Sequence, residues 1–289
     1  MKKLKYGLIV ILIVLLILFI IFKLWVNHNL NVQQIPVLMY HNVVYDEYFD
    51  NYPDTISLST FEKQLQYFKE HNYKTLTLEE FYCWKINKCQ IKGNAVVLTF
   101  DDGFYSFHHL VEPLLEKYDM HAVNFVIGDT LEEKTIEYNP KKYSTIGIDL
   151  INNHSKHVDY QSHSYAMHYT VDGKPKVYSM KKEDIDKDIT TMNELANEPF
   201  HYLSYPYNTD IDDFIFELKK KNYKLAFRGE DEKAVRNCDN FKISRIGVTE
   251  NFDHFKSIFE TKKYNNRYGN GLIRKVFITI ERKLKTKLF

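Results

Sequence analysis

Two adjacent aspartates at the end of an apolar run are the residues whose types most clearly suggest chemistry. Residues 95–103 read AVVLTFDDG, so apolar and β-branched side chains give way to Asp101, Asp102 and a glycine. This pattern is typical of a buried strand that carries charged groups at its C-terminal end. Because neighbouring side chains of a strand point to opposite faces, one aspartate is suited to bind a metal and the other to transfer protons. The alternative is an ordinary strand-to-helix turn in which an aspartate caps the helix.

Two histidines follow a later strand of the same kind. His163 and His168 lie in the run QSHSYAMH, directly after a predicted strand near residues 158–163. Two imidazoles and the Asp102 carboxylate at neighbouring strand ends would form a metal site that leaves positions open for water and substrate. Either histidine alone is more often a hydrogen-bonded polar residue than a ligand, and the chain has 12 histidines.

A proline turn ends a further predicted strand. Residues 204–207 read SYPY, and the proline would fix a turn that aims the backbone amide of Tyr207 inward as an oxyanion donor. The same letters also describe a simple rigid aromatic turn.

The elements that position these residues alternate between strand and helix. The predicted strands are residues 35–41, 73–76, 95–100, 122–127, 158–163, 202–205, 224–228 and 241–248. Capping boxes at Ser59 with Glu62 and at Thr77 with Glu80 predict two helices, and further helices are expected near residues 107–115, 146–152, 183–196, 211–220 and 252–259. This alternation indicates parallel strands with helices outside, as an open sheet or a barrel, and in both the C-terminal strand ends build the active site.

The three motifs together resemble those of the polysaccharide deacetylases, the NodB-homology carbohydrate esterases. TFDDG at 99–103, HSYAMH at 163–168 and YPY at 205–207 occur in the family's order, and the resemblance extends over about residues 35–259. It implies an α/β fold with a distorted (β/α) barrel and metal-dependent removal of N- or O-linked acetyl groups. It also implies Asp101 as the general base, with Asp102, His163 and His168 as ligands of zinc or a similar divalent ion.

Several positions depart from the common family pattern. The histidine pair is one residue wider, and the early pair Tyr40 and His41 in VLMYHNV is similar to the branch that deacetylates poly-N-acetylglucosamine. In that branch the early histidine, here His41, replaces the general acid of a late LxH motif, which this chain lacks. The usual arginine two residues before the proline is Ser204, and Arg245 in SRIGV is our candidate to tune the base instead. The usual glycine after PY is Asn208, which tolerates the same left-handed backbone.

The implied reaction follows from the residue types. An amide is a poor electrophile with a poor leaving group, so a metal is needed to polarise the carbonyl and to lower the pKa of a bound water to about 7. Asp101 would take the proton of that water, and the Tyr207 amide would stabilise the oxyanion. His41 would protonate the departing amine.

The ends of the 289-residue chain predict a membrane anchor. Residues 1–29 carry four lysines and no acid, residues 261–289 carry nine basic residues and one acid, and the stretch between carries 26 basic and 37 acidic residues. The apolar residues 6–22 with 24–26 could cross a bilayer core of about 30 Å, and no small-residue cleavage site follows them. We therefore expect one uncleaved N-terminal transmembrane helix within 1–26, with the N-terminus cytoplasmic.

The remaining organisation follows from this anchor. We expect a linker at 27–34, an extracellular catalytic domain at 35–261 and a basic amphipathic tail at 262–289. The tail could lie on the membrane, bind an anionic wall polymer, or pack its apolar side on the barrel. Cys83 and Cys89 could form a disulfide across a short loop or stay free thiols.

We expect a membrane-anchored deacetylase of N-acetylglucosamine units in an exopolysaccharide, with a divalent metal, zinc first, as its cofactor. Its partners would be the acetylated polysaccharide and the membrane, and not nucleic acid; the sequence does not indicate an oligomeric state. Peptidoglycan or another cell-wall glycan is the alternative substrate. A carbohydrate-binding protein on an inactive scaffold is the alternative of another class, and retention of both aspartates, both histidines and His41 argues against it.

Overall fold

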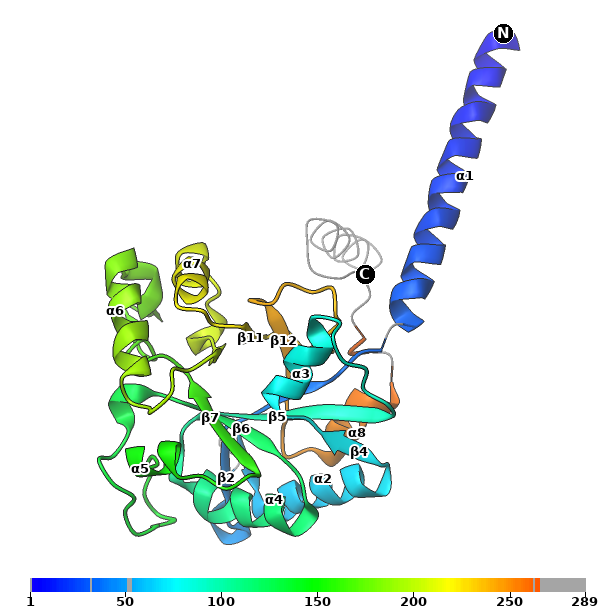
Figure 1. Ribbon diagram of the computed structural model, residues 1–289. Coiled ribbons are helices and arrows are strands. Elements are labelled where there is room, and N and C mark those ends of the chain that lie inside the picture. Colours follow the sequence, from blue (N-terminus) through cyan, green and yellow to red (C-terminus); the bar gives the residue numbers. More distant parts are fainter. Residues whose placement is uncertain (1, 32, 51–53, 262, 266–289) are drawn as a thin grey trace. The chain divides into compact units, whose positions relative to one another are not determined.

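A closed ring of parallel strands forms the centre of the computed structural model, which describes residues 2–31, 33–50, 54–261 and 263–265 (Figure 1). Within these residues the ring consists of β1 (Val37–Tyr40), β12 (Ile243–Gly247), β11 (Leu225–Gly229), β10 (Tyr202–Ser204), β7 (Val158–Ser162), β6 (Ala122–Val126) and β5 (Asn94–Asp102). Strand β1 closes it by pairing in parallel with β12 on one edge and β5 on the other. The short β4 (Tyr73–Thr75) extends the sheet beside the first residues of β5. The predicted (β/α) barrel is therefore confirmed, and the open sheet is wrong.

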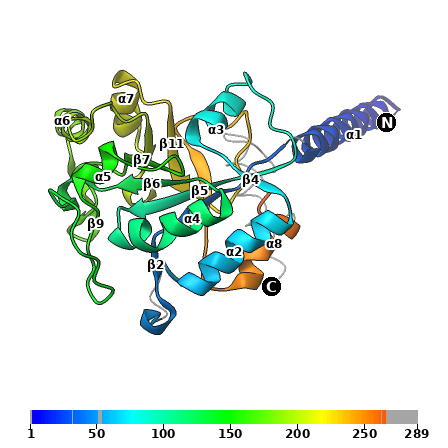
Figure 2. The ribbon, with the colours of Figure 1, turned by 60° about the horizontal axis from the view of Figure 1, so that its bottom comes forward.

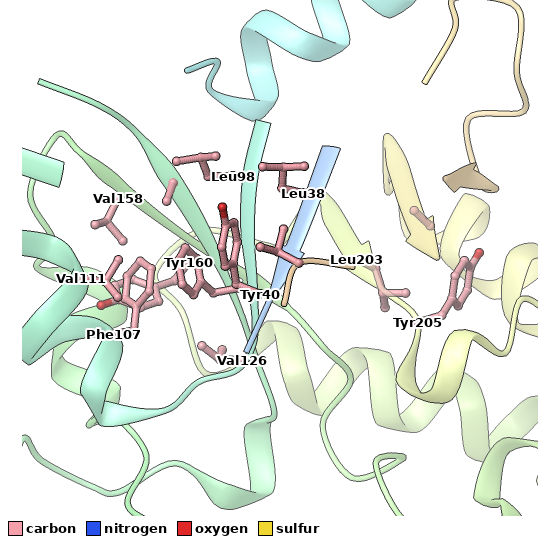
Figure 3. Packing of buried hydrophobic residues seen from close by; sticks show 14 of the residues in the cluster. Leu38, Tyr40, Leu98, Phe107, Val111, Val126, Val158, Tyr160, Leu203 and Tyr205 are labelled. Atoms are coloured by element: carbon pink, nitrogen blue, oxygen red, sulfur yellow. The ribbon is translucent and has the colours of Figure 1, made fainter. Parts of the chain in front are cut away.

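Alternate residues of the strands pack into two separate apolar clusters. One includes Leu38, Leu98, Tyr160 and Leu203, which pack with side chains of the covering helices, as Figure 3 shows for Phe107. The other includes strand residues of opposite parity and fills the inside of the ring. Its strand members include Val37, Val97, Val123, Phe125, Tyr202, Leu225, Phe227 and Ile243. At the C-terminal ends of the strands, the inward-facing positions are occupied by polar residues.

The helices surround the ring. They are α2 (Leu58–Glu70), α3 (Leu78–Lys85), α4 (Glu112–Tyr118), α5 (Ile148–Asn152), α6 (Lys182–Asn193), α7 (Asp212–Lys220) and α8 (Phe252–Glu260). Helix α2 contacts both α4 and α8, and α6 packs against α7 (Figure 2). A π-helical turn, η2 (Phe107–Val111), precedes α4 and follows the aspartate motif.

Several short elements were not predicted. These are the parallel pair β2 (Asn42–Val44) and β3 (Thr55–Ser57), the hairpin β8 (Thr170–Val171) and β9 (Lys174–Pro175), and the 3₁₀ turns η1 (Asp46–Tyr48), η3 (Gly128–Thr130) and η4 (Lys176–Ser179). The 3₁₀ turn η5 (Pro206–Asn208) lies at the predicted proline turn.

The predicted capping box at Ser59 and Glu62 is wrong. The N-cap of helix α2 is Ser57, two residues before the predicted cap, and its Oγ accepts a hydrogen bond from the Thr60 amide, so the helix begins at Leu58. The Glu250 carboxylate accepts hydrogen bonds from the Ser57 amide and from the hydroxyls of Ser57 and Thr60. Glu250, which is distant in the sequence, therefore stabilises the N-terminus of α2. The spacing of residues near the helix start could not predict this contact.

Helix α3 starts as predicted and carries a disulfide. Thr77 and Glu80 form the expected capping box. Cys83 and Cys89 are joined by a disulfide, so the free-thiol alternative is wrong, while Cys238 is a buried free cysteine within the described chain.

The N-terminal segment forms its own helix, α1 (Lys2–Asn31). Among the residues that the structure describes, we find no helix with the length and apolar character needed to span a membrane. The membrane anchor stays a prediction. Residues 35–264 form one compact unit, and the predicted amphipathic helix of the tail falls mainly on residues 266–289, outside the described residues.

Candidate metal and catalytic site

A cavity of about 400 Å³ lies at the C-terminal ends of the barrel strands. Its lining includes residues that the sequence singles out, namely His41, Asp101, Asp102, His163, His168, Tyr207 and Asn208. Parallel strands bring their C-terminal ends to one side of a barrel, so motifs far apart in the chain meet there.

Asp101 is buried and held by a bidentate ion pair with Arg245. Nη1 of the Arg245 guanidinium group donates to Asp101 Oδ1 at 2.8 Å, and Nη2 donates to Oδ2 at 2.7 Å. Arg245 also donates to Thr99 Oγ1 at 3.1 Å and to Ser204 Oγ at 2.7 Å. On β5, Thr99 and Asp101 lie on the strand face that points into the barrel. On β12, Arg245 comes two residues after the inward-facing Ile243 and faces inward as well, so the alternation of side chains along the strands brings the three residues together.

This pairing sets the charge of Asp101. Burial by itself would raise the pKa of the carboxyl group, because a charged form is poorly solvated inside a protein. The neighbouring Arg245 guanidinium outweighs burial, with smaller contributions from His163 and His41, and holds the pKa well below its usual range. Asp101 is therefore ionised at neutral pH, with Arg245 as its buried counterion.

Removal of this counterion should strongly destabilise the fold. Arg245→Met would leave the Asp101 carboxylate buried without a cation, and the free energy of unfolding should fall by about 3 to 5 kcal/mol. Urea denaturation measures this change. Arg236→Met, at a partly exposed arginine, should cost less than about 1 kcal/mol.

A double variant separates charge from packing. Asp101→Asn together with Arg245→Met removes both charges, so it should recover much of the stability lost in Arg245→Met alone. A double variant that is less stable than Arg245→Met would show that the ion pair is not the cause.

Asp102 leaves the strand geometry and faces different partners from Asp101. Its φ is +76°, and Gly103 follows with φ +73°, so the expected alternation of neighbouring side chains does not hold here. Both aspartates line the same cavity. A Cβ on Gly103 would lie 3.2 Å from Val126 Cγ1, so the close approach and the left-handed backbone both favour glycine.

The two histidines converge on Asp102. His163 Nε2 and His168 Nε2 each lie 3.5 Å from Asp102 Oδ1. The Nδ1–H of His163 donates to the Ser204 carbonyl oxygen at 2.8 Å, which leaves the Nε2 lone pair directed toward Asp102. The His168 ring stacks on Tyr207 with centroids 4.7 Å apart.

These three residues fit a metal ion. One ligand atom from each lies within 4.8 Å of the others. Asp102 Oδ1 is buried and has no hydrogen-bond partner among the described residues, which is costly for a carboxylate oxygen unless a cation satisfies it. Two imidazole nitrogens and a carboxylate oxygen are also a donor set suited to divalent transition metals.

The other predicted residues lie around this centre. His41 follows β1, and its Nε2 is 4.0 Å from Asp101 Oδ2. Tyr207 and Asn208 both have left-handed backbones, with φ of +52° and +59°. The Asn208 side chain accepts a hydrogen bond from the Gly229 amide, so the expected left-handed asparagine is present and held in place. The oxyanion role of the Tyr207 amide stays a prediction.

Comparison with known proteins points to one family. A polysaccharide deacetylase profile matches residues 89–226, a stretch that contains the aspartate pair, the histidine pair and the proline turn. Over this stretch the chain is similar to the polysaccharide deacetylase family.

Relatives and solved structures of this family resemble the chain. A poly-β-1,6-N-acetyl-D-glucosamine N-deacetylase of Staphylococcus aureus (strain MRSA252) is 26% identical over 213 residues, covering 69% of this chain and 70% of that protein. The Streptococcus pyogenes deacetylase PplD, solved with acetate, has a TM-score of 0.66 at 22% identity and covers 80% of this chain and 100% of its own. IcaB from Ammonifex degensii has a TM-score of 0.63 at 22% identity and covers 78% of this chain and 94% of its own. These structural likenesses establish a shared deacetylase fold.

One contact in the site was missed from the sequence. Ser204 was noted only because it stands where an arginine is usual, yet its hydroxyl donates to Asp101 Oδ2 at 3.2 Å and accepts from Arg245. Ser204 comes two residues after Tyr202 on β10, and Tyr202 faces the inside of the barrel. This alternation could have predicted that Ser204 faces inward too. Arg245 on β12 binds the Asp101 carboxylate next to the Ser204 hydroxyl.

Proposed function

We propose that this chain is a metal-dependent N-deacetylase acting on the N-acetylglucosamine units of an exopolysaccharide. The observation that carries the proposal is the pairing of two neighbouring carboxylates with different partners: Asp102 with two imidazoles, and Asp101 with Arg245. The names of the staphylococcal relatives support this polymer as the substrate.

The donor set supports zinc as the metal, because two imidazole nitrogens and a carboxylate oxygen are typical ligands of this ion. Asp102 Oδ1 lies 3.5 Å from each imidazole nitrogen, and the three ligand atoms all lie within 4.8 Å of one another. A divalent ion held there would supply a Lewis acid for the acetyl carbonyl and an acidified water.

The chain's own residues would move the protons and hold the substrate. Asp101 is ionised and can accept the proton of the attacking water, while Arg245 fixes the orientation of its carboxylate. His41 lines the same cavity and can donate a proton to the departing amine. The Tyr207 amide would donate to the oxygen of the acetyl group as negative charge develops on it.

The role of His41 gives a prediction that compares two leaving groups. His41→Ala should lower deacetylation of an unactivated acetamide by about 10²-fold or more, because an amine must be protonated to leave. Hydrolysis of an activated aryl acetate should fall much less, since a phenolate leaves without a proton. Steady-state kinetics on both substrates measure the difference.

Metal content and folding serve as controls for this comparison. Both should match the wild type in His41→Ala, and His154→Ala, at an exposed histidine, should change neither substrate's rate. Equal losses on both substrates would assign His41 a structural role.

The shape of the site supports a polymer as substrate. A second cavity of about 190 Å³ shares Asn42, Phe104 and Tyr143 with the catalytic cavity and extends to Tyr138 and Lys141. Aromatic side chains at such positions can pack on sugar rings next to the one being deacetylated.

A panel of acetylated glycans tests the proposed substrate. The full-length protein should release acetate, with one free amine per acetate, fastest from β-1,6-linked N-acetylglucosamine oligomers. Faster release from peptidoglycan fragments would favour the wall-glycan alternative. Tight binding of a glycan without acetate release would favour a carbohydrate-binding protein.

The proposed location of the enzyme is the outer side of the cell membrane. Lysines before an apolar run and the lack of a small-residue cleavage site after it support a single-pass anchor with an extracellular catalytic domain. The protein should fractionate with membranes at its full mass. Recovery of a shortened chain from the medium would contradict the anchor.

A further inference from the structure

The loop between the two histidine ligands is held by a carboxylate from a neighbouring helix. Asp188, in the middle of α6, accepts the Tyr165 amide on Oδ1 and the Ala166 amide on Oδ2, both at 2.8 Å. These two amides belong to the residues between His163 and His168. The loop between the two histidines therefore has a side-chain acceptor for two of its backbone amides.

Asp188 is placed for this contact by the packing of α6. The residue is only 7% exposed, and Ile185, Ile189 and Met192 of the same helix are buried in the outer core cluster. A buried carboxylate in the middle of a helix is costly unless its oxygens are satisfied, and the two loop amides satisfy one oxygen each.

The opposite side of the loop is also held. The Ser164 and Tyr165 carbonyl oxygens accept hydrogen bonds from the Gly128 and Asp129 amides at 3.0 and 2.9 Å. Lys176 Nζ donates to the Ala166 carbonyl oxygen at 3.0 Å. Asp188 is thus the side-chain partner for two consecutive amides of a loop whose remaining contacts come mainly from its carbonyl groups.

We propose that Asp188 is a positioning residue that holds His168 in its metal-binding place. This inference rests on the proposed metal site of Asp102, His163 and His168. The loop held in this way places His168 Nε2 3.5 Å from Asp102 Oδ1. Without Asp188, part of the free energy of metal binding must order the loop, so the affinity falls.

The experiment measures zinc affinity in the full-length protein by competition with a chromophoric chelator. Asp188→Asn keeps the size of the side chain but offers one acceptor and sets its NH₂ group against the second amide. The dissociation constant for Zn²⁺ should rise by about 10- to 100-fold. At saturating Zn²⁺, kcat should return to within a few-fold of the wild type, because Asp188 touches neither the substrate nor the reacting atoms.

The matched control is Asp186→Asn on the same helix. Asp186 pairs with Lys220 and Lys221 at the surface, so its replacement should leave the zinc affinity unchanged. Unchanged affinity in Asp188→Asn, or an equal loss in Asp186→Asn, would overturn the inference.

A second variant tests the same loop if Asp188→Asn does not fold. Lys176→Met removes the contact to the Ala166 carbonyl oxygen and should weaken zinc binding by several-fold in the same direction. If Asp188→Asn is unfolded and Lys176→Met binds zinc normally, the inference is wrong. A wild type that binds zinc but releases no acetate would contradict the proposed function alone, whereas one that binds no zinc would overturn both.

Discussion

Asp102→Ala, His163→Ala and His168→Ala are each expected to lose the metal and the deacetylase activity together. Each change removes one of three protein ligands, and two ligands hold a divalent ion poorly. The loss of affinity should exceed the roughly 100-fold that changes outside the ligand set reach. Metal analysis of the purified variants and acetate release from the same samples measure both losses.

The three variants also test each residue separately. His154→Ala replaces an exposed histidine outside the cavity and should keep the wild-type metal content. Full metal occupancy in any one of the three ligand variants would remove that residue from the site, even if its activity were lost.

Asp101→Asn should give the opposite combination, with the metal retained and most turnover lost. The asparagine keeps the size of the side chain but cannot accept the proton of the attacking water, so kcat should fall by about 10² to 10⁴-fold. Arg245 loses its counterion in this variant, so circular dichroism must first show that the barrel is folded. Near-normal turnover would exclude Asp101 as the base.

Much of the site could be predicted because its residues lie at the ends of recognisable strands. The apolar run before Asp101 indicates a buried strand, and parallel pairing brings the end of β5 beside β6 and then β7, where His163 follows. Arg245 was chosen because Ser204 stands in place of the usual arginine, and its position agrees with strand alternation, since a side chain two residues after an inward-facing one faces inward too. Local sequence patterns were sufficient for these residues, because the alternation of side chains along a strand decides which way each side chain points.

Other features depend on contacts that no local pattern encodes. Glu250 supports the start of α2 from 190 residues away, counted from Thr60, and this contact made the predicted Ser59 cap wrong. In the sequence, Asp188 looks like an ordinary polar residue of an amphipathic helix. Only the tertiary structure shows that it accepts hydrogen bonds from the loop between the two histidines. The left-handed backbone of Asp102 likewise follows from the close approach at Gly103 and not from strand propensity.

The most direct test of a metal-dependent deacetylase is acetate release before and after removal of the metal. The full-length wild type would be assayed on a β-1,6-linked N-acetylglucosamine oligomer as purified, after treatment with a chelator, and after addition of Zn²⁺. We predict release by the purified protein, none from protein shown to be metal-free, and recovery when one ion per chain is restored. Undiminished acetate release from the metal-free protein, or none from the fully loaded one, would contradict the proposed function.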